Sequence, residues 1–159
     1  MGFRRIGNKG LPANHESVMG VLMNKYQCKI ASSAQVYDGD TIKDVRISIE
    51  IPSLEVGFWI TRDIRINGID TPEKRPWRAG RTAESLLAEK AAAKQARDYL
   101  IGILEANDFA FEVGDVGYGK YAGRVLADVF VAGENVSNLM IEAGHAKAYD
   151  GGKKPVWDF

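Results

Sequence analysis

The sequence has little cysteine, no long apolar run and no excess of charge of either sign. Its single cysteine, Cys28, excludes an intramolecular disulfide and a metal site built from several cysteines. The apolar run at residues 18–23 is shorter than the apolar region of an ordinary signal peptide, and no stretch approaches the length of a membrane span. We therefore expect no membrane partner and a cytoplasmic protein by default, with secretion or a periplasmic location left open.

The balance of charge bears on whether the protein can bind nucleic acid through its overall charge. Lys and Arg together number 21, as do Asp and Glu, so the formal net charge is zero. A protein that binds nucleic acid through a strongly basic overall field is therefore excluded, and any nucleic-acid site must be local.

The length of 159 residues fits one globular domain with its own core. Residues 1–22 mix Gly, Asn, Pro and basic residues without a helical or strand period, which is typical of a flexible arm. Met23 would itself make a plausible start of translation. We expect a flexible arm over residues 1–22 and a monomeric domain over residues 23–159.

Hydrophobic periodicity predicts five strands. Residues 45–51 alternate strictly between apolar and polar, which is the period of a half-buried strand. Residues 58–69 alternate again, with Phe58 and Ile66 on the apolar face and Arg65 on the opposite face. The other expected strands are residues 26–37, 109–113 and 124–131.

Composition predicts two helices. Residues 82–106 are dominated by good helix formers and contain no proline. The apolar residues of this helix form a stripe that needs a partner surface: Leu86, Leu87, Ala91, Leu100, Ile103 and Leu104. A short helix over residues 136–143 has Asn135 placed to cap it and Gly144 placed to end it.

These elements predict a mainly β fold with helices (α+β). The expected architecture is a five-stranded OB-fold-type barrel with the long helix between strands 3 and 4 and the short helix near the C-terminus. Alternation alone does not separate such a barrel from a β-sandwich.

Two polar stretches stand at strand ends. In "VYDGDT", Asp38 and Asp40 flank a glycine before a strand, a pattern that is more often a turn than a metal site. The stretch lacks the further oxygen ligands and the closing glutamate of an EF-hand, which excludes that site. In "RINGIDTPE", residues 65–73, an arginine is followed across a strand end by two acidic residues and a threonine.

Taken in order, five motifs resemble the staphylococcal (micrococcal) nuclease family, the thermonuclease-like domain. They are "VYDGDTIK", "RINGIDTPE", "KYAGRVLADV", "NLMIEAGHAKAY" and "YDGGKKPVW", and the resemblance covers about residues 26–157. It implies an OB-fold-type barrel that hydrolyses phosphodiester bonds in DNA and RNA with a calcium ion.

The resemblance also implies roles for individual residues. The calcium ligands would be Asp40, Asp70 and the backbone carbonyl of Thr71. The catalytic residues would be Glu73, which activates the attacking water, and Arg65 and Arg124, which grip the phosphate. The substrate-binding residues would be Lys120, Tyr121 and Tyr149.

These roles make physical sense for a phosphodiester, whose anionic oxygens repel a nucleophile. A hard cation with oxygen ligands neutralises charge that builds up in the transition state, and a guanidinium donates two hydrogen bonds to one phosphate. Two carboxylates and one carbonyl form an open site, so we expect a calcium dissociation constant of about 10⁻⁴ to 10⁻³ M.

Two features depart from the family pattern beside the second arginine. Gly119 stands where the family has an acidic residue before Lys-Tyr, and Ala122 is inserted before the Gly-Arg pair. Both departures concern the placement of Arg124.

The alternative to a nuclease is a catalytically silent OB-fold module that binds nucleic acid.

Charge and aromatic content bear on the substrate. Residues 1–22 carry a balance of +2, which leaves −2 for the rest of the chain. We therefore expect local binding of one or two phosphates and a preference for single-stranded DNA or RNA. Trp59, Trp77 and Trp157 are expected to be packing residues.

Overall fold

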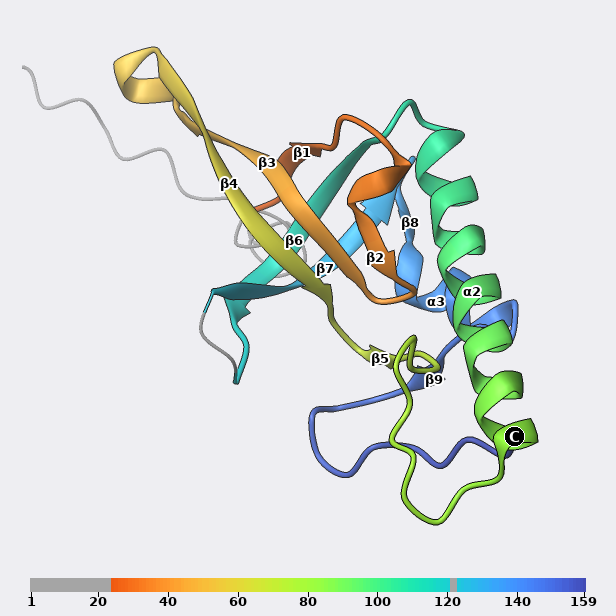
Figure 1. Cartoon of the computed structure of the whole chain (residues 1–159). Coiled ribbons are helices and arrows are strands. Elements are labelled where there is room, and N and C mark those ends of the chain that lie inside the picture. The colour runs from red at the N-terminus through yellow and green to blue at the C-terminus, as the bar shows by residue number, and fades with distance from the viewer. Residues whose placement is uncertain (1–23, 121–122) are drawn as a thin grey trace, which may run out of the picture.

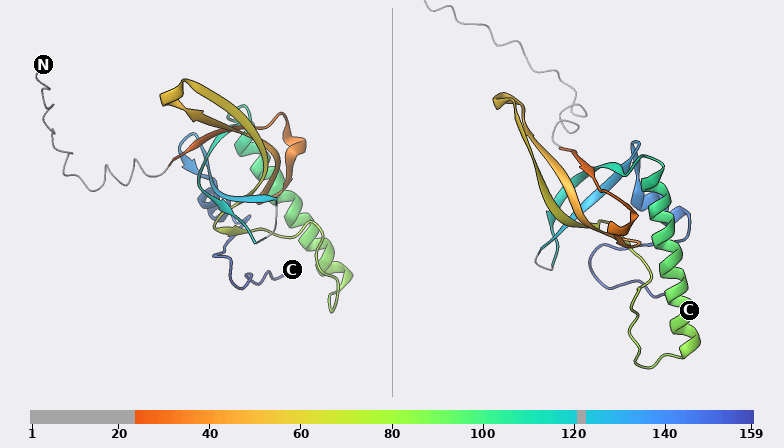
Figure 2. Two further views of the ribbon diagram at one scale, coloured as in Figure 1. Left: turned by 90° about the vertical axis from the view of Figure 1, so that its left-hand side faces the viewer. Right: turned by 45° about the horizontal axis from the view of Figure 1, so that its top comes forward.

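The structure, a computed structural model, describes residues 24–120 and 123–159. The predicted arm at residues 1–22 and Tyr121 lie outside the described residues. Five strands curl into a closed ring, which the left view of Figure 2 shows end-on. They are β1 (Tyr26–Lys29), β3 (Thr41–Ile51), β4 (Val56–Ile66), β6 (Ala110–Tyr118) and β7 (Arg124–Val131).

Strand pairing explains the closure. The strands run in the order β1, β6, β7, β4 and β3, and β1 also pairs with β3, which completes the ring. The β4–β7 pairing is parallel and the other pairings in the ring are antiparallel. The predicted α+β fold with an OB-type ring is therefore confirmed.

Short elements complete the fold within the described residues. Strand β2 (Val36–Asp38) pairs with β3, β5 (Ile69–Asp70) pairs with β9 (Lys147–Ala148), and β8 (Glu134–Asn135) pairs with β7. Two 3₁₀ turns are η1 (Ser33–Gln35) and η2 (Pro52–Leu54).

The single strand predicted over residues 26–37 is wrong, because η1 separates β1 from β2. Ser32 accepts a hydrogen bond from the Ala34 backbone, and the Gln35 side chain accepts bonds from the Ala31 and Ser32 backbones. These side chains satisfy backbone groups that a continuous strand would have paired, so a turn forms.

Both predicted helices are present. Helix α2 (Ala83–Glu105) begins at Thr82, whose side chain accepts a hydrogen bond from the Ser85 backbone. Helix α3 (Val136–Glu142) begins at Asn135, whose side chain accepts bonds from two backbone amides, and Gly144 follows it with a φ of 77°. The caps expected from the sequence therefore form.

Helix α2 lies along one side of the barrel and extends below it (Figure 1). Its buried face carries Glu89, Ala93, Ala96, Leu100 and Leu104. The predicted apolar stripe is therefore partly wrong: Leu87 is 67% exposed and Ala91 is also exposed. Two alanines, rather than leucines, face the barrel in the middle of the helix, where the backbone of the site comes close.

The β3–β4 hairpin extends past the ring at the upper left of Figure 1. Ile64 and Ile66 are fully buried inside the ring, whereas Phe58 and Trp59 are each 50% exposed on the hairpin. Phe58 was expected on the core face, but none of the described elements covers the hairpin at that height. Neither described helix is long and apolar enough to cross a membrane.

Cys28 gives a test of this core. Burial raises the pKa of its thiol from 9.0 to about 12. Because the folded pKa is the higher one, its contribution to stability is complete below pH 9 and is lost as the pH rises. The free energy of unfolding should fall by about 1.4 kcal/mol per pH unit above pH 9, relative to a Cys28→Ala variant. Urea unfolding of both proteins across this range measures the difference, and parallel curves would contradict it.

Candidate active site

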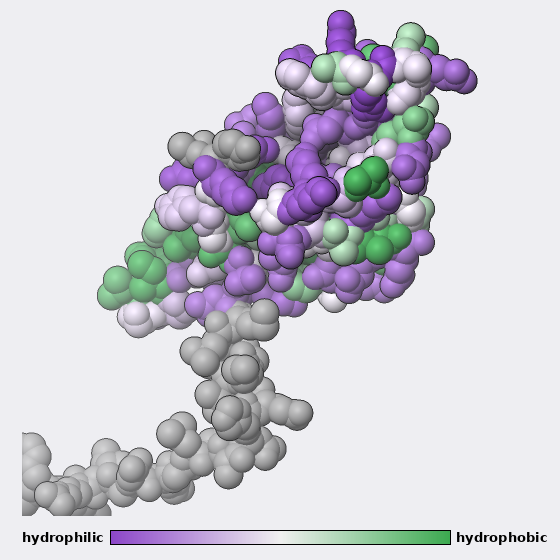
Figure 3. Space-filling view, turned by 90° about the horizontal axis from the view of Figure 1, so that it is seen from below, coloured by the Kyte–Doolittle hydropathy of each residue, from purple (hydrophilic) through white to green (hydrophobic). Residues whose placement is uncertain are grey.

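One cavity of about 660 Å³ gathers most of the predicted site residues. It is lined by Asp40, Arg65, Thr71, Glu73, Lys120, Arg124 and Tyr149. Five parts of the chain meet there: the β2–β3 turn, the end of β4, the segment after β5, the β6–β7 connection and the segment after β9. The segments after β5 and β9 lie at the lower end of the barrel in Figure 1. Figure 3 shows this end from below, where hydrophilic residues dominate the surface.

Gly39 explains how the "DGD" turn reaches the cavity. A Cβ atom at this position would lie 2.9 Å from the Cβ of Ala96 and 2.9 Å from the Cγ2 of Thr71. Only glycine fits, because the turn is packed between helix α2 and the segment after β5. The close approach holds Asp40 against Thr71.

Asp40 and Arg65 form the centre of the site. Asp40 is 7% exposed, and its Oδ2 lies 2.7 Å from Arg65 Nη1. The same oxygen accepts hydrogen bonds from the Thr71 backbone (3.3 Å) and hydroxyl (3.1 Å), while Oδ1 accepts one from the Thr41 hydroxyl (2.9 Å). Arg65 stands opposite Thr41 in the β3–β4 register and points away from the apolar core, as predicted.

Asp70 is the second carboxylate beside Arg65. It is 2% exposed, and its Oδ2 accepts a hydrogen bond from Trp157 Nε1 at 3.1 Å. Its Oδ1 lies 3.2 Å from Lys154 Nζ and 3.8 Å from Arg65 Nη2, yet neither contact has hydrogen-bond geometry. One buried oxygen of Asp70 therefore has no hydrogen-bond partner and can still accept one.

Glu73 lies at the mouth of the cavity with about half of its side chain exposed. Its Oε1 accepts a hydrogen bond from Lys154 Nζ at 2.6 Å. Its backbone amide donates to Glu89 Oε1 at 3.0 Å, and Glu89 is buried and ion-paired with Arg81. Helix α2 thus holds the Glu73 backbone while the carboxylate stays accessible.

Lys154 was not predicted as a site residue. Partial burial lowers its pKa, but the hydrogen bond and charge of Glu73 and the charge of Asp70 outweigh that effect, so the pKa is raised. Lys154 is therefore a charged lysine between the two carboxylates. Trp157, expected as a packing residue, instead hydrogen-bonds Asp70.

Asp38 lies behind Asp40. It accepts a hydrogen bond from the Asp40 backbone at 3.2 Å. Burial, and then the charge of Asp40, raise the pKa of Asp38 to about 7. The hydrogen bond fixes the turn, and the raised pKa means that Asp38 is partly protonated near neutral pH.

The predicted substrate-binding residues line the opposite wall. Lys120 Nζ donates to the Gly151 carbonyl at 2.8 Å, and the Tyr149 hydroxyl donates to the Gly152 carbonyl at 3.1 Å. Arg124 begins β7 opposite Asp63 and lines the same cavity. Tyr121 lies outside the described residues.

The donor set suits a hard cation. Among the described residues, no group of three or more His, Cys, Asp or Glu side chains is arranged to hold a metal ion. Two buried carboxylates nevertheless face one guanidinium, and Asp70 Oδ1 has no hydrogen-bond partner. Together with the Thr71 hydroxyl oxygen beside Asp40, these carboxylates are ligands of the oxygen type that hard divalent cations take.

Comparisons with known proteins agree with this geometry. A family model described as Staphylococcal nuclease homologue matches residues 63–156, and a comparison with curated proteins finds no match. The matched range runs from the end of β4 to the segment after β9 and includes Arg65, Asp70, Glu73 and Arg124. Because it covers more than half of the sequence, the chain belongs to the staphylococcal nuclease homologue family.

Proposed function

We propose that this protein is a calcium-dependent nuclease that hydrolyses phosphodiester bonds in DNA, RNA or both. The observation that carries the proposal is the meeting of Asp40, Arg65 and Asp70 beside one cavity, with Glu73 at its mouth. Membership in the nuclease family supports the same reaction class.

Calcium would be held by Asp40, Asp70 and the Thr71 carbonyl, and it would neutralise charge on the phosphate oxygens in the transition state. Arg65 and Arg124 would bind the remaining phosphate oxygens through their planar donors. Lys120, Tyr121 and Tyr149 would hold the nucleotide. With these roles assigned to other residues, Glu73 is left to take a proton from the attacking water.

Glu73 would act as general base. Its carboxylate would take a proton from water as the water oxygen bonds to phosphorus; the bond from phosphorus to the leaving sugar oxygen would break, and that oxygen would take up a proton from solvent. Because Oε1 accepts from Lys154, the other oxygen would take the proton of the attacking water. Lys154 then keeps the base in one orientation.

One observation favours a second candidate, the catalytically silent binding module. Glu73 is paired with Lys154, and Arg65 with Asp40, so these charged groups stabilise one another within the protein. Catalysis requires that substrate and calcium replace some of these contacts. The nuclease is preferred because the carboxylates, the base and both arginines are all present.

The two candidates are separated by following cleavage and binding of the same oligonucleotide. A single-stranded DNA with a fluorophore and a quencher, in millimolar calcium, should be cut faster than its duplex by a monomeric protein. A chelator should stop cleavage. Binding of the single strand with no cleavage in calcium would establish the binding module instead.

Lys154 provides a prediction about calcium itself. Its ammonium lies 3.2 Å from Asp70 Oδ1, where it opposes a bound cation. Lys154→Gln should lower the calcium dissociation constant about 5-fold, since removing a like charge about 4 Å away in water is worth about 1 kcal/mol. Titration calorimetry without nucleic acid measures this, with Trp157 fluorescence as a second signal.

Lys153→Gln is the matched control, because Lys153 is an exposed neighbour on the same segment. Its calcium affinity should remain near that of the unmodified protein. Equal affinities for Lys154→Gln and Lys153→Gln would contradict the placement of calcium beside Asp70.

A further inference from the structure

The loop that follows Glu73 displays an unpacked tryptophan among basic side chains. We call residues 74–79 the basic loop; it contains Lys74, Arg75 and Arg78, all exposed. Trp77 is 80% exposed. The prediction that Trp77 is a packing residue is therefore wrong, and the tryptophan is available to a partner.

The other tryptophans of the chain are engaged within the protein. Trp157 donates a hydrogen bond to Asp70 and stacks on Phe159, with ring centres 5.8 Å apart. Trp59 lies under the Arg46 guanidinium at 5.0 Å. Trp77 is thus the most exposed of the three tryptophans, and its ring is free to stack on a partner's base.

Packing, a backbone hydrogen bond and an ion pair hold the basic loop in place. Pro76 is buried, and the Arg81 backbone amide donates to the Arg78 carbonyl at 3.3 Å, which closes a turn. Arg81 then pairs with the buried Glu89 of helix α2. These contacts fix both ends of the segment that presents Trp77.

The basic loop adjoins the active-site cavity. A second cavity of about 610 Å³ is lined by residues 75–79 together with Glu73 and Lys154. Glu73 and Lys154 also line the first cavity. On the other side, Lys74 Nζ lies 4.8 Å from the ring centre of Tyr37, a residue of the first cavity. A ligand in the first cavity can therefore continue onto the basic loop.

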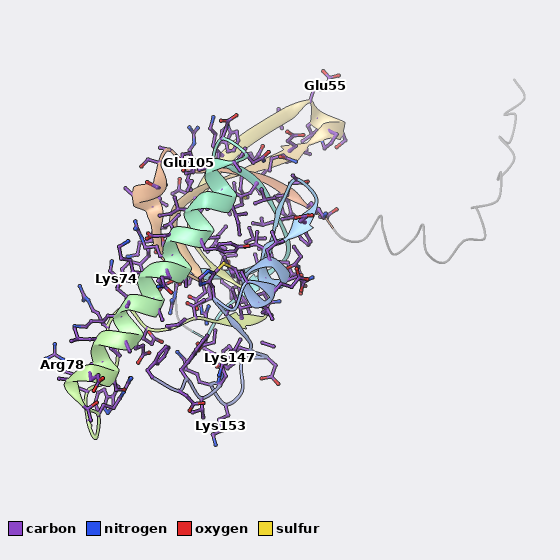
Figure 4. All side chains as sticks on the ribbon, turned by 90° about the vertical axis from the view of Figure 1, so that its right-hand side faces the viewer. Glu55, Lys74, Arg78, Glu105, Lys147 and Lys153 are labelled. Carbon is purple, nitrogen blue, oxygen red and sulfur yellow. The ribbon has the colours of Figure 1, made fainter. Side chains whose placement is uncertain are left out.

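Charge favours a polyanion on this surface. Figure 4 shows Arg78 at the start of helix α2 and Lys74 farther along the same helix, with the acidic Glu55 and Glu105 toward the opposite end of the molecule. The chain after the first 22 residues is net acidic, so this local excess of positive charge is not a general property of its surface. Phosphates are the groups that guanidinium binds best.

We propose that the basic loop is a second subsite for single-stranded nucleic acid. The base of a nucleotide beside the cleaved phosphate stacks on Trp77, and Arg75 and Arg78 contact the phosphates that flank it. Stacking requires an unpaired base, so the subsite selects single strands over duplexes. This proposal rests on the nuclease function proposed above and adds the path of the strand beyond the first cavity.

The test measures binding in a chelator, so that nothing is cleaved. Fluorescence anisotropy compares a labelled dinucleotide with a single strand of about ten nucleotides, which is within the site size of one OB-fold. Unmodified protein should bind the longer strand more tightly. Trp77→Ala should bind it about 5- to 100-fold more weakly, and Trp77→Phe should recover most of the loss.

Trp59→Ala is the matched control, because Trp59 is a half-exposed tryptophan on the distant β3–β4 hairpin. It should bind both strands like the unmodified protein. Equal losses in Trp77→Ala and Trp59→Ala, or no loss in Trp77→Ala, would overturn the subsite.

Two further measurements distinguish a failure of the subsite from a failure of the proposed nuclease function. Cleavage of the longer strand in calcium by both the unmodified protein and Trp77→Ala with the same KM would overturn the subsite and leave the nuclease standing. No cleavage and no binding by the unmodified protein would overturn both. Binding of polyglutamate as tight as that of the longer strand would assign the loop to an acidic polypeptide and overturn the nucleic-acid subsite.

Discussion

Replacing Glu73 by glutamine is expected to lower kcat by about 10²- to 10⁴-fold, the usual contribution of a general base. Glutamine keeps the shape and the hydrogen bond to Lys154 but has no basic oxygen for the proton of water. The Glu73 side chain is half exposed, so the loss of its ion pair changes stability little. Steady-state cleavage of a single-stranded oligonucleotide in calcium measures the effect.

Glu105→Gln is the control for this change, because Glu105 is exposed at the opposite end of helix α2 (Figure 4). Its kcat should equal that of the unmodified protein. The binding constant of Glu73→Gln for the oligonucleotide should also remain close to normal. If Glu73→Gln cleaves at the normal rate, Glu73 is not the base and another group must accept the proton.

Replacing Arg65 by lysine is expected to lower kcat/KM by about 10²- to 10³-fold. The guanidinium lies against Asp40 and near Asp70, and among the described residues it is the one cation that lies within 4 Å of both carboxylates. Lysine keeps the charge but cannot donate two parallel hydrogen bonds to a phosphate. The loss should therefore appear in the chemical step, and single-turnover cleavage at saturating protein isolates it.

Lysine is a better replacement for Arg65 than alanine, because alanine would destabilise the folded protein. Alanine would leave Asp40 and Asp70, which are 7% and 2% exposed, without their arginine, and breaking a buried ion pair costs about 3–5 kcal/mol. Arg62→Ala serves as the control, since Arg62 is exposed on the same strand. Equal rates for Arg65→Lys and Arg62→Ala would remove Arg65 from the catalytic machinery.

Local sequence pattern predicts much of the barrel. The bounds of β7, residues 124–131, agree with the structure because Val125, Ala127, Val129 and Val131 alternate with less buried residues along the whole strand. The same period places Arg65 opposite the core. Helix α3 is also predicted well, since Asn135 caps it through its own side chain.

Predictions fail where distant parts of the chain decide the outcome. The helix stripe includes Leu87 because it is apolar, but helix α2 extends past the barrel there and nothing covers that leucine. In the middle of the helix, Ala96 is buried because Gly39 packs against it at close range. Neither fact is visible in the helix sequence alone.

In the candidate site, too, local sequence predicts some residues and contacts between distant parts of the chain decide others. The "DGDT" and "DTPE" stretches identify the carboxylates and the base, because the residue types and their order carry the chemistry. Lys154 and Trp157 reach the site across 81 and 87 residues of sequence, and no local pattern indicates those contacts. The motif "YDGGKKPVW" contains both residues, so the resemblance pointed to the right segment without assigning them a role.

Cleavage of a single-stranded oligonucleotide by the unmodified protein, first in a chelator and then after calcium is restored, tests the central claim most directly. A calcium-dependent nuclease should show no cleavage in the chelator and full recovery in millimolar calcium, where Glu73→Gln should cut about 10²- to 10⁴-fold more slowly. Cleavage that continues in the chelator, or that proceeds at the normal rate in Glu73→Gln, would contradict a calcium-dependent nuclease at this cavity.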